Sequence, residues 1–252
     1  MKRLLVIGIG AGDPDHLTLQ AVKAIAATDV FFIVDKGETK QELIQLRLDL
    51  IAEHGRKPYR IAEARDPERD RTAPAYAAAV EDWRSRRSLA CEALIHEELG
   101  AGETGAFLVW GDPAVYDSTL AILDEIRRRG NVTFDVEVVP GISSVAALTA
   151  RHRIGLTQVG RPTHLTTGRR LAEQGPTADD VVVMLDAHCS FTGLDDFHIY
   201  WGAYLGTPDE ILVSGPVPEA GDRIRRLRAE ARDRKGWIMD TYLLRRLSPG
   251  DR

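Results

Sequence analysis

Three short glycine-containing segments each follow an apolar run of the kind found in buried strands. They are residues 8–13 (GIGAGD), 111–118 (GDPAVYDS) and 140–144 (PGISS). In open α/β sheets ligands bind outside the carboxyl ends of the strands, and glycine lets a ligand approach the backbone closely. Because all three segments are expected at one edge of one sheet, they predict a ligand-binding cleft.

The first of these segments also resembles part of a dinucleotide-binding fingerprint. Gly8 and Gly10 match the start of GxGxxG, but the third position is Asp13, an anion where a pyrophosphate would approach. Asp35, at the end of the next predicted strand, could imitate the ribose-binding acid. A nicotinamide-dependent oxidoreductase therefore stays open as an alternative.

Composition excludes several other classes of function. The chain has 252 residues and a net charge of −5, so its overall charge does not favour nucleic acid or a membrane surface. Its two cysteines have no CxxC spacing and its histidines no metal-ligand spacing, so no metal is expected. The apolar run after Lys2 and Arg3 is too short for an export signal or a membrane span. We expect a cytoplasmic protein.

The elements that would position the three segments have an α/β order. A strand, a glycine loop, a helix and a second strand ending at Asp35 form a βαβ unit. Residues 42–100 are expected to be mostly helical, interrupted by a polar segment at 62–74. Further strands are predicted at 106–110 and 135–139, with helices at 119–129 and 145–150.

The pattern changes near residues 153–157, where we place a domain boundary. The sequence predicts an N-terminal α/β domain over 1–154 and a C-terminal mixed α/β domain over 155–252. In the second domain strands are expected at 163–166, 181–185, 198–204, 210–216 and 237–242, with a helix at 222–232.

The ordered motifs resemble those of the tetrapyrrole (class III) methyltransferases of cobalamin and siroheme synthesis. GIGAGDPDHLTLQAVKAI is similar to their opening GxGxGDxxxLTxxAxxxI, WGDPAVYDS to GDPxxYxS, and VVPGISSVAAL to VxPGxSS/TxxA. Ala11 departs from the pattern, since many relatives have proline there. The resemblance implies the two-domain tetrapyrrole methylase fold, with a mainly parallel N-terminal sheet, a mixed-sheet C-terminal domain and an active cleft between them.

The same resemblance implies S-adenosylmethionine as the methyl donor and a homodimer as the usual assembly. Asp112 could instead be a turn or capping residue, and Met184 could be plain core. Carried over residue by residue, the positions implied to contact the donor are Ala11, Trp110, Gly111, Asp112, Val115, Ser143, Ser144, Met184 and Gly206.

Finer features imply the reaction within the family. DVFFIVDKGE, the helical insert at 42–99 and IYWGAYLGTPDEILVSGPV resemble the members that methylate C-1 of a precorrin and release acetate, converting precorrin-5 to precorrin-6A. Two alternatives stay open: methylation at another position of the precorrin or siroheme pathway, and a non-catalytic tetrapyrrole carrier.

Acetate release and substrate binding call for further side chains. Release needs water to attack a carbonyl, and Asp35 is the candidate catalytic base, unless it merely pairs with Lys36. Arginine forks match the carboxylates of a precorrin substrate. The candidates have acidic neighbours, so a solvated loop is the alternative; they are Arg60, Arg65, Arg69, Arg71, Arg169 and Arg170.

Overall fold

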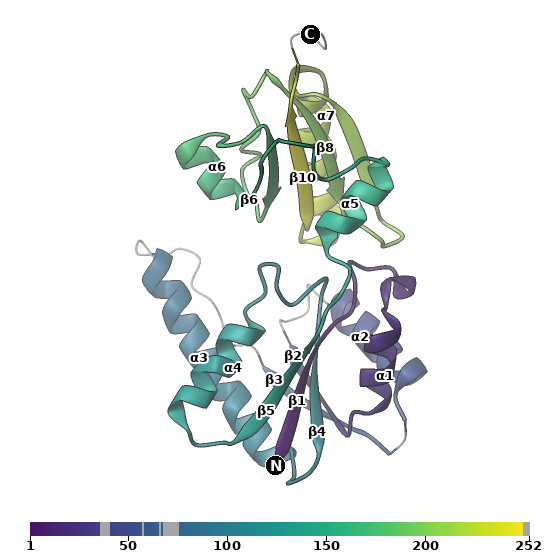
Figure 1. Cartoon of the computed structure of the whole chain (residues 1–252), viewed down its shortest axis with the longest axis vertical. Helices are drawn as coiled ribbons and strands as arrows, with labels where there is room; N and C mark the ends of the chain where they lie inside the picture. The colour runs from purple at the N-terminus through teal and green to yellow at the C-terminus, as the bar shows by residue number, and fades with distance from the viewer. Residues whose placement is uncertain (36–40, 57, 66, 68–75, 249–252) are drawn as a thin grey trace. The chain divides into compact units, whose positions relative to one another are not determined.

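The chain forms two compact units in the computed structural model, which describes residues 1–35, 41–56, 58–65, 67 and 76–248 (Figure 1). The first unit contains residues 1–10 and 14–142, and the second contains residues 11–13 and 143–252. Each unit is built around its own sheet.

The first unit holds a sheet in which every neighbouring pair of strands is parallel. In sheet order the strands are β3 (Arg60–Arg65), β2 (Val30–Asp35), β4 (Thr104–Val109), β1 (Lys2–Gly8) and β5 (Phe134–Val139). Residues 4–9 are buried, as expected of a strand covered on both faces. The prediction of a mainly parallel N-terminal sheet is confirmed.

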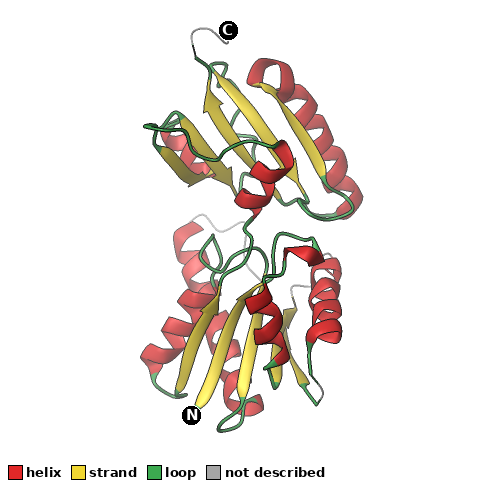
Figure 2. Ribbon diagram, turned by 45° about the vertical axis from the view of Figure 1, so that its right-hand side comes forward, coloured by secondary structure: helices red, strands yellow, loops and turns green. Residues whose placement is uncertain are grey.

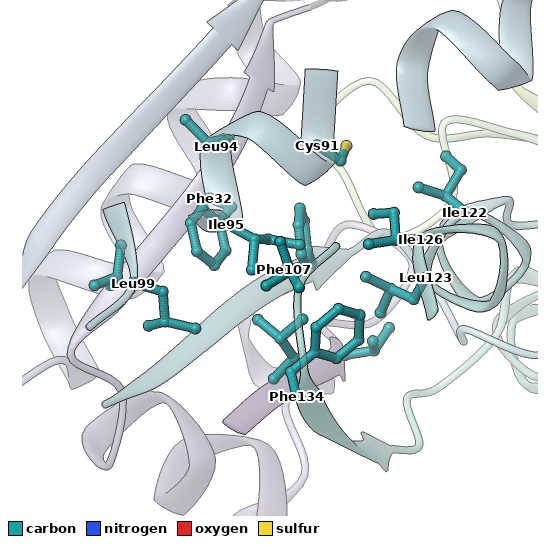
Figure 3. Packing of buried hydrophobic residues seen from close by; sticks show 14 of the residues in the cluster. Phe32, Cys91, Leu94, Ile95, Leu99, Phe107, Ile122, Leu123, Ile126 and Phe134 are labelled. Carbon is teal, nitrogen blue, oxygen red and sulfur yellow. The ribbon is translucent and has the colours of Figure 1, made fainter. Parts of the chain in front are cut away.

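Helices cover both faces of this sheet (Figure 2). On one face lie α1 (Leu19–Ala26) and α2 (Gln41–His54), and on the other α3 (Tyr76–Glu98) and α4 (Thr119–Arg129). A single 3-10 turn, η1 (Pro14–His16), precedes α1. Figure 3 shows the core under α3 and α4, where Phe32 and Phe107 stack with ring centroids 4.9 Å apart.

The second unit holds a mixed sheet, also as the sequence predicts. β6 and β7 run parallel, and the remaining neighbours are antiparallel. In sheet order the strands are β6 (Thr163–Thr167), β7 (Asp180–Met184), β10 (Asp240–Arg246), β8 (Phe197–Ala203) and β9 (Ile211–Pro216). The helices are α5 (Ser144–His152), α6 (Gly168–Gln174) and α7 (Val217–Lys235).

The two units divide earlier in the chain than the sequence indicates. We expect the boundary near residues 153–157 from the change of pattern, whereas the contacts divide the chain between Ile142 and Ser143. The reason is α5, whose residues Val145 and Leu148 pack in one apolar cluster with the second sheet.

Two elements differ from the sequence-based expectation. Strand β3 occupies part of a region expected to be helical or polar loop, and in it only Ala62 is buried. Helix α6 begins at Gly168, where a loop is expected, and Thr167 accepts a hydrogen bond from Arg170 N at 3.5 Å. Both are short and mostly exposed, so they lack an apolar period.

Candidate functional site

In the first unit, the three glycine loops leave adjacent strands. β1 lies between β4 and β5, so the loops that follow them emerge side by side at the carboxyl edge of the sheet. Two of the loops are joined directly, because Gly111 N donates to Gly10 O at 2.7 Å and Gly10 N donates to Gly111 O at 3.3 Å. The prediction that these loops gather at one edge is confirmed.

Side chains are excluded where the loops cross. A Cβ added to Gly8 would lie 2.6 Å from Gly141 N, and one added to Gly141 would lie 2.1 Å from Gly111 O. Gly111 also has φ of 71°, a conformation in which glycine is not strained. These glycines are therefore required by the packing of the loops themselves, which leaves bare backbone at the edge of the sheet.

Asp112 ties two of the loops together. Its Oδ1 accepts a hydrogen bond from Ala114 N at 2.8 Å within its own turn, and its Oδ2 accepts from Gly141 N at 2.9 Å. With both oxygens engaged by the backbone, the carboxylate stabilises the loops, which is the turn role that the sequence left open. Trp110 and Val115 on either side are half-buried.

Tyr116 lies in the same loop and is not among the positions predicted to contact the donor. It adopts φ of 51°, which is uncommon for a residue with a side chain, and it is 46% exposed. Burial raises the pKa of its hydroxyl. The motif GDPxxYxS contains this tyrosine, so the signal was present in the sequence.

In the second unit, Ala11 and the start of α5 belong to one arrangement. Ala11 is buried in an apolar cluster against which Met184 also packs. Ser143 is the N-cap of α5, its hydroxyl accepting from Ala146 N at 3.2 Å, and Ser144 Oγ accepts from Thr241 Oγ1 at 3.2 Å. Both serines therefore have structural partners in addition to any ligand.

Gly206 lies in a tight turn of the same unit. It has φ of 76°, and its N–H donates to Glu210 Oε2 at 2.9 Å. Its neighbour Leu205 packs in the cluster that contains Ala11. The nine candidate donor contacts therefore fall in two sets, with Trp110, Gly111, Asp112 and Val115 in the first unit and Ala11, Ser143, Ser144, Met184 and Gly206 in the second.

A buried ionic network, not foreseen from the sequence, follows β7. Asp186 accepts hydrogen bonds from Tyr242 Oη at 2.7 Å and from Ser190 N at 2.6 Å. Arg228 donates to the carbonyl of Asp186 at 2.6 Å and pairs with Asp240 at 2.9 Å. Burial, reinforced by Asp186, strongly raises the pKa of Tyr242, so its hydroxyl keeps its proton as donor. The network fixes the chain just beyond Met184.

The candidate substrate residues are scattered. Asp35 ends β2 at the carboxyl edge of the sheet, in register with Arg65 of β3. The side chain of Asp35 lies outside the described part of the structure, and so do Lys36, Arg69 and Arg71. Arg60 begins β3 at the opposite edge and pairs with Glu103 at 2.8 Å. Arg169 and Arg170 lie on α6 and both pair with Glu173.

The described residues hold neither a metal-ligand cluster nor a membrane-spanning helix. In that part of the chain, no three histidine, cysteine, aspartate or glutamate side chains are grouped as metal ligands would be. Within the same residues, no helix combines the length and the apolar composition needed to cross a membrane.

Comparison with known proteins places the chain in a family. The family model of tetrapyrrole (corrin/porphyrin) methylases matches residues 3–221. A precorrin-6A synthase (deacetylating) of Sinorhizobium sp. is 49% identical over 250 residues, covering 98% of this chain and 96% of the relative.

Solved structures agree with the predicted fold. A cobalamin synthesis related protein (CobF) from Corynebacterium diphtheriae has a TM-score of 0.85 and 36% identity, covering 98% of this chain and 100% of its own. A uroporphyrin-III-C-methyltransferase from Thermus thermophilus shares the fold, with a TM-score of 0.58 and 22% identity over 97% of this chain and 92% of its own. The chain therefore belongs to the tetrapyrrole (corrin/porphyrin) methylase family.

Proposed function

We propose that the chain transfers a methyl group from S-adenosylmethionine to C-1 of precorrin-5 and releases acetate to give precorrin-6A. The observation that carries this is the convergence of the three glycine loops at one sheet edge, in a chain whose Sinorhizobium relative is a deacetylating precorrin-6A synthase. Methylation at another position of a precorrin is the second candidate, since a relative named precorrin-2 C(20)-methyltransferase also aligns with this chain.

The donor contacts both residue sets in this proposal. S-adenosylmethionine, when bound, supplies a methyl group on a sulfonium, so the protein mainly has to hold two reactants in line. The bare backbone around Gly111 would admit the donor closely. In the second unit, half-buried Met184 and the serine hydroxyls at the start of α5 offer apolar and polar contacts. These residues fit a nucleoside with a polar tail.

Asp35 is the proposed base for acetate release. It is the last residue of β2, at the same sheet edge as the glycine loops. A positioned base typically contributes ~10²–10⁴-fold to such a proton transfer. Asp35→Asn keeps the shape and removes the basicity, so methyl gain should continue while acetate loss slows.

The test follows both steps by mass spectrometry after a single turnover with precorrin-5. We expect the product to gain one methyl group and lose one acetyl group, and Asp35→Asn to accumulate a methylated, still acetylated product. Methylation without loss of the acetyl group in the unaltered chain would favour the second candidate. If both steps of the variant run at the original rate, Asp35 is not the base.

Donor binding is tested separately by calorimetry with S-adenosylmethionine, S-adenosylhomocysteine and NADP. Gly111→Val should abolish binding of the first two, because a branched side chain at positive φ distorts the loop and occupies the donor's approach. Gly102→Val is the matched control, since Gly102 has φ of 85° with nothing within 4 Å of an added Cβ. Binding of NADP alone would return the oxidoreductase to consideration.

The working assembly completes the proposal. We propose a homodimer in the cytoplasm, as is usual in the family. Sedimentation equilibrium of the purified chain tests the dimer, and cell fractionation tests the compartment. A chain that stays monomeric at micromolar concentration would contradict the first.

A further inference from the structure

Strands β2 and β4 separate before they end. Their pairing stops at Phe32 and Phe107, whereas β4 continues to pair with β1 as far as Val109. A cavity of about 70 Å³ lies at this point in the first unit, with walls that include residues 32–34 of β2 and 107–109 of β4. A single water needs roughly 10–15 Å³ measured in this way, so the cavity can hold a group larger than one water.

Arg47, which extends from α2, lines the cavity. Arg47 Nε donates to Leu108 O at 2.9 Å, and Nη1 donates to Leu43 O at 2.5 Å. The first of these carbonyls belongs to the part of β4 that no longer pairs with β2. The two bonds fix the orientation of the guanidinium, but both acceptors are neutral.

The charge of Arg47 has no ion-pair partner among the described residues. Asp117 also lines the cavity and attracts Arg47, but its Oδ1 accepts from Thr119 N at 2.7 Å and it forms no ion pair with Arg47 within the described part of the chain. Burial, opposed by Asp117 and assisted by the nearby Arg87, lowers the pKa of Arg47 to about 10. Arg47 is half-buried, and a cation partly withdrawn from water without a bonded counterion is unfavourable.

A second guanidinium lines the same cavity from α3. The Cζ atom of Arg87 lies 5.2 Å from the centre of the Trp83 ring, a cation–π contact that keeps the group in place. Two cations beside an apolar wall match a ligand with a carboxylate at one end and a short hydrocarbon at the other.

We propose that this cavity binds a short aliphatic carboxylate, with its oxygens on Arg47 and its carbons against the ends of β2 and β4. The identity of the natural ligand rests on the proposed function. Two sources supply this chemistry: an acetate or propionate arm of the tetrapyrrole substrate, and the acetate that the reaction releases. None of the arginines singled out from the sequence lines this cavity, and of the three glycine loops only the second reaches it, through Asp117.

The first experiment needs no turnover. Sodium acetate and sodium propionate are titrated into the full chain at constant ionic strength, with binding followed by NMR of the methyl-labelled protein. We expect saturable shifts at Leu43, Ile44 and Leu108. Arg47→Met should weaken binding about 10-fold or more, because a charge-assisted hydrogen bond is lost. Arg127→Met, an exposed arginine of α4, is the control and should bind like the original chain.

Two results would overturn the proposal. One is that neither anion gives saturable shifts at these residues in the unaltered chain. The other is that Arg47→Met binds both anions as tightly as Arg127→Met does. Arg47 is not among the proposed donor contacts of either unit, so a folded Arg47→Met variant should still bind S-adenosylmethionine. Calorimetry with this donor therefore shows whether the variant is folded.

The second experiment distinguishes the two sources by kinetics with precorrin-5. If the cavity holds a substrate arm, acetate competes with the precorrin and Arg47→Met raises KM about 10- to 100-fold. If it holds the released acetate, added acetate inhibits without competing, and Arg47→Met relieves that inhibition. Inhibition by acetate that is unchanged in Arg47→Met would contradict both. If the unaltered chain shows no methyl transfer, the proposed function fails while the titration still decides the cavity.

Discussion

Arg47 in the first unit is half-buried and Arg228 in the second is buried, and the groups that they bond differ. Arg228 pairs with the carboxylate of Asp240 at 2.9 Å and also donates to Asp186 O at 2.6 Å. Within the described residues, Arg47 donates to the carbonyls of Leu108 and Leu43. Burial acts on both pKa values downward, yet the pKa of Arg228 is raised because Asp240 attracts its charge, whereas the pKa of Arg47 falls to about 10.

The difference separates a structural cation from one that is available to a ligand. The Arg228–Asp240 pair is closed, meaning that both charges are bonded within the protein: Asp240 accepts from Arg228 and also from Trp201 Nε1 at 3.0 Å. It holds the chain that follows Met184, one of the proposed donor contacts. Arg47 forms no ion pair within the described residues: Asp117 attracts it across the cavity that both line, but makes no salt bridge with it. The stability of variants can test this contrast directly.

The largest effect is expected when the closed pair is broken. Arg228→Met leaves Asp240 buried without its cation, and removal of one partner of a buried pair costs about 3–5 kcal/mol. Urea unfolding of the full chain, followed by tryptophan fluorescence, measures the loss. A change below about 1 kcal/mol would mean that water compensates Asp240 and that the pair is not closed.

A smaller loss is expected when both charges are removed together. In Arg228→Met with Asp240→Asn no buried charge is left over, and the Asn oxygen can still accept from Trp201 Nε1. The double variant should lose about 1–3 kcal/mol, less than Arg228→Met alone. If the double variant is the less stable of the two, hydrogen bonding rather than charge dominates at this pair.

At the other arginine we expect little change. Arg47→Met removes a charge with no ion-pair partner among the described residues, which offsets the loss of its hydrogen bonds to two carbonyls. The free energy of unfolding should change by less than about 1 kcal/mol in buffer without carboxylates. A loss near that of Arg228→Met would show that Arg47 has a structural role, and it would erase the contrast between the two arginines.

The sequence predicts the fold well where apolar patterns are strong. Residues 3–9 and 106–110 correspond closely to β1 and β4, because strands buried on both faces form unbroken apolar runs. β3 is missed because RIAEAR lies at the sheet edge with mostly exposed polar side chains, which resemble a charged loop. The boundary differs because α5 carries apolar residues whose packing partner cannot be known before the fold is known.

The candidate site likewise contains residues that the sequence predicts and residues that it does not. Glycine spacing predicts the three loops, since close approach of backbones leaves a residue-type signature at Gly8, Gly111 and Gly141. Arg47 and the Arg228 network leave none. In the sequence, Arg47 and Arg228 are both ordinary charged residues within a helical pattern. Only the tertiary contacts show that Arg228 is paired with Asp240 and that Arg47 lines a cavity.

The smallest effect is expected at an exposed arginine, which gives the contrast its reference point. Arg60 donates from Nη1 and Nη2 to the two oxygens of Glu103, at 3.0 and 2.8 Å. These bonds, with one from Gly100 N, lower the pKa of Glu103 from 4.5 to about 2. A carboxyl whose pKa is lowered by folding stabilises the protein above its ordinary pKa, and this stability is lost as the pH falls from 4.5 toward 2.

Because the Arg60–Glu103 pair is exposed to solvent, its contribution should be only about 0.2–1 kcal/mol at neutral pH. Glu103→Gln and Arg60→Gln should therefore lower the free energy of unfolding slightly and by similar amounts at pH 7. The difference from the original chain should shrink as the pH is lowered from 5 to 3, and salt should reduce it at pH 7. Urea unfolding at several pH values measures this. A deficit that stays constant with pH would indicate lost packing of the Arg60 stem rather than lost charge, since packing does not titrate.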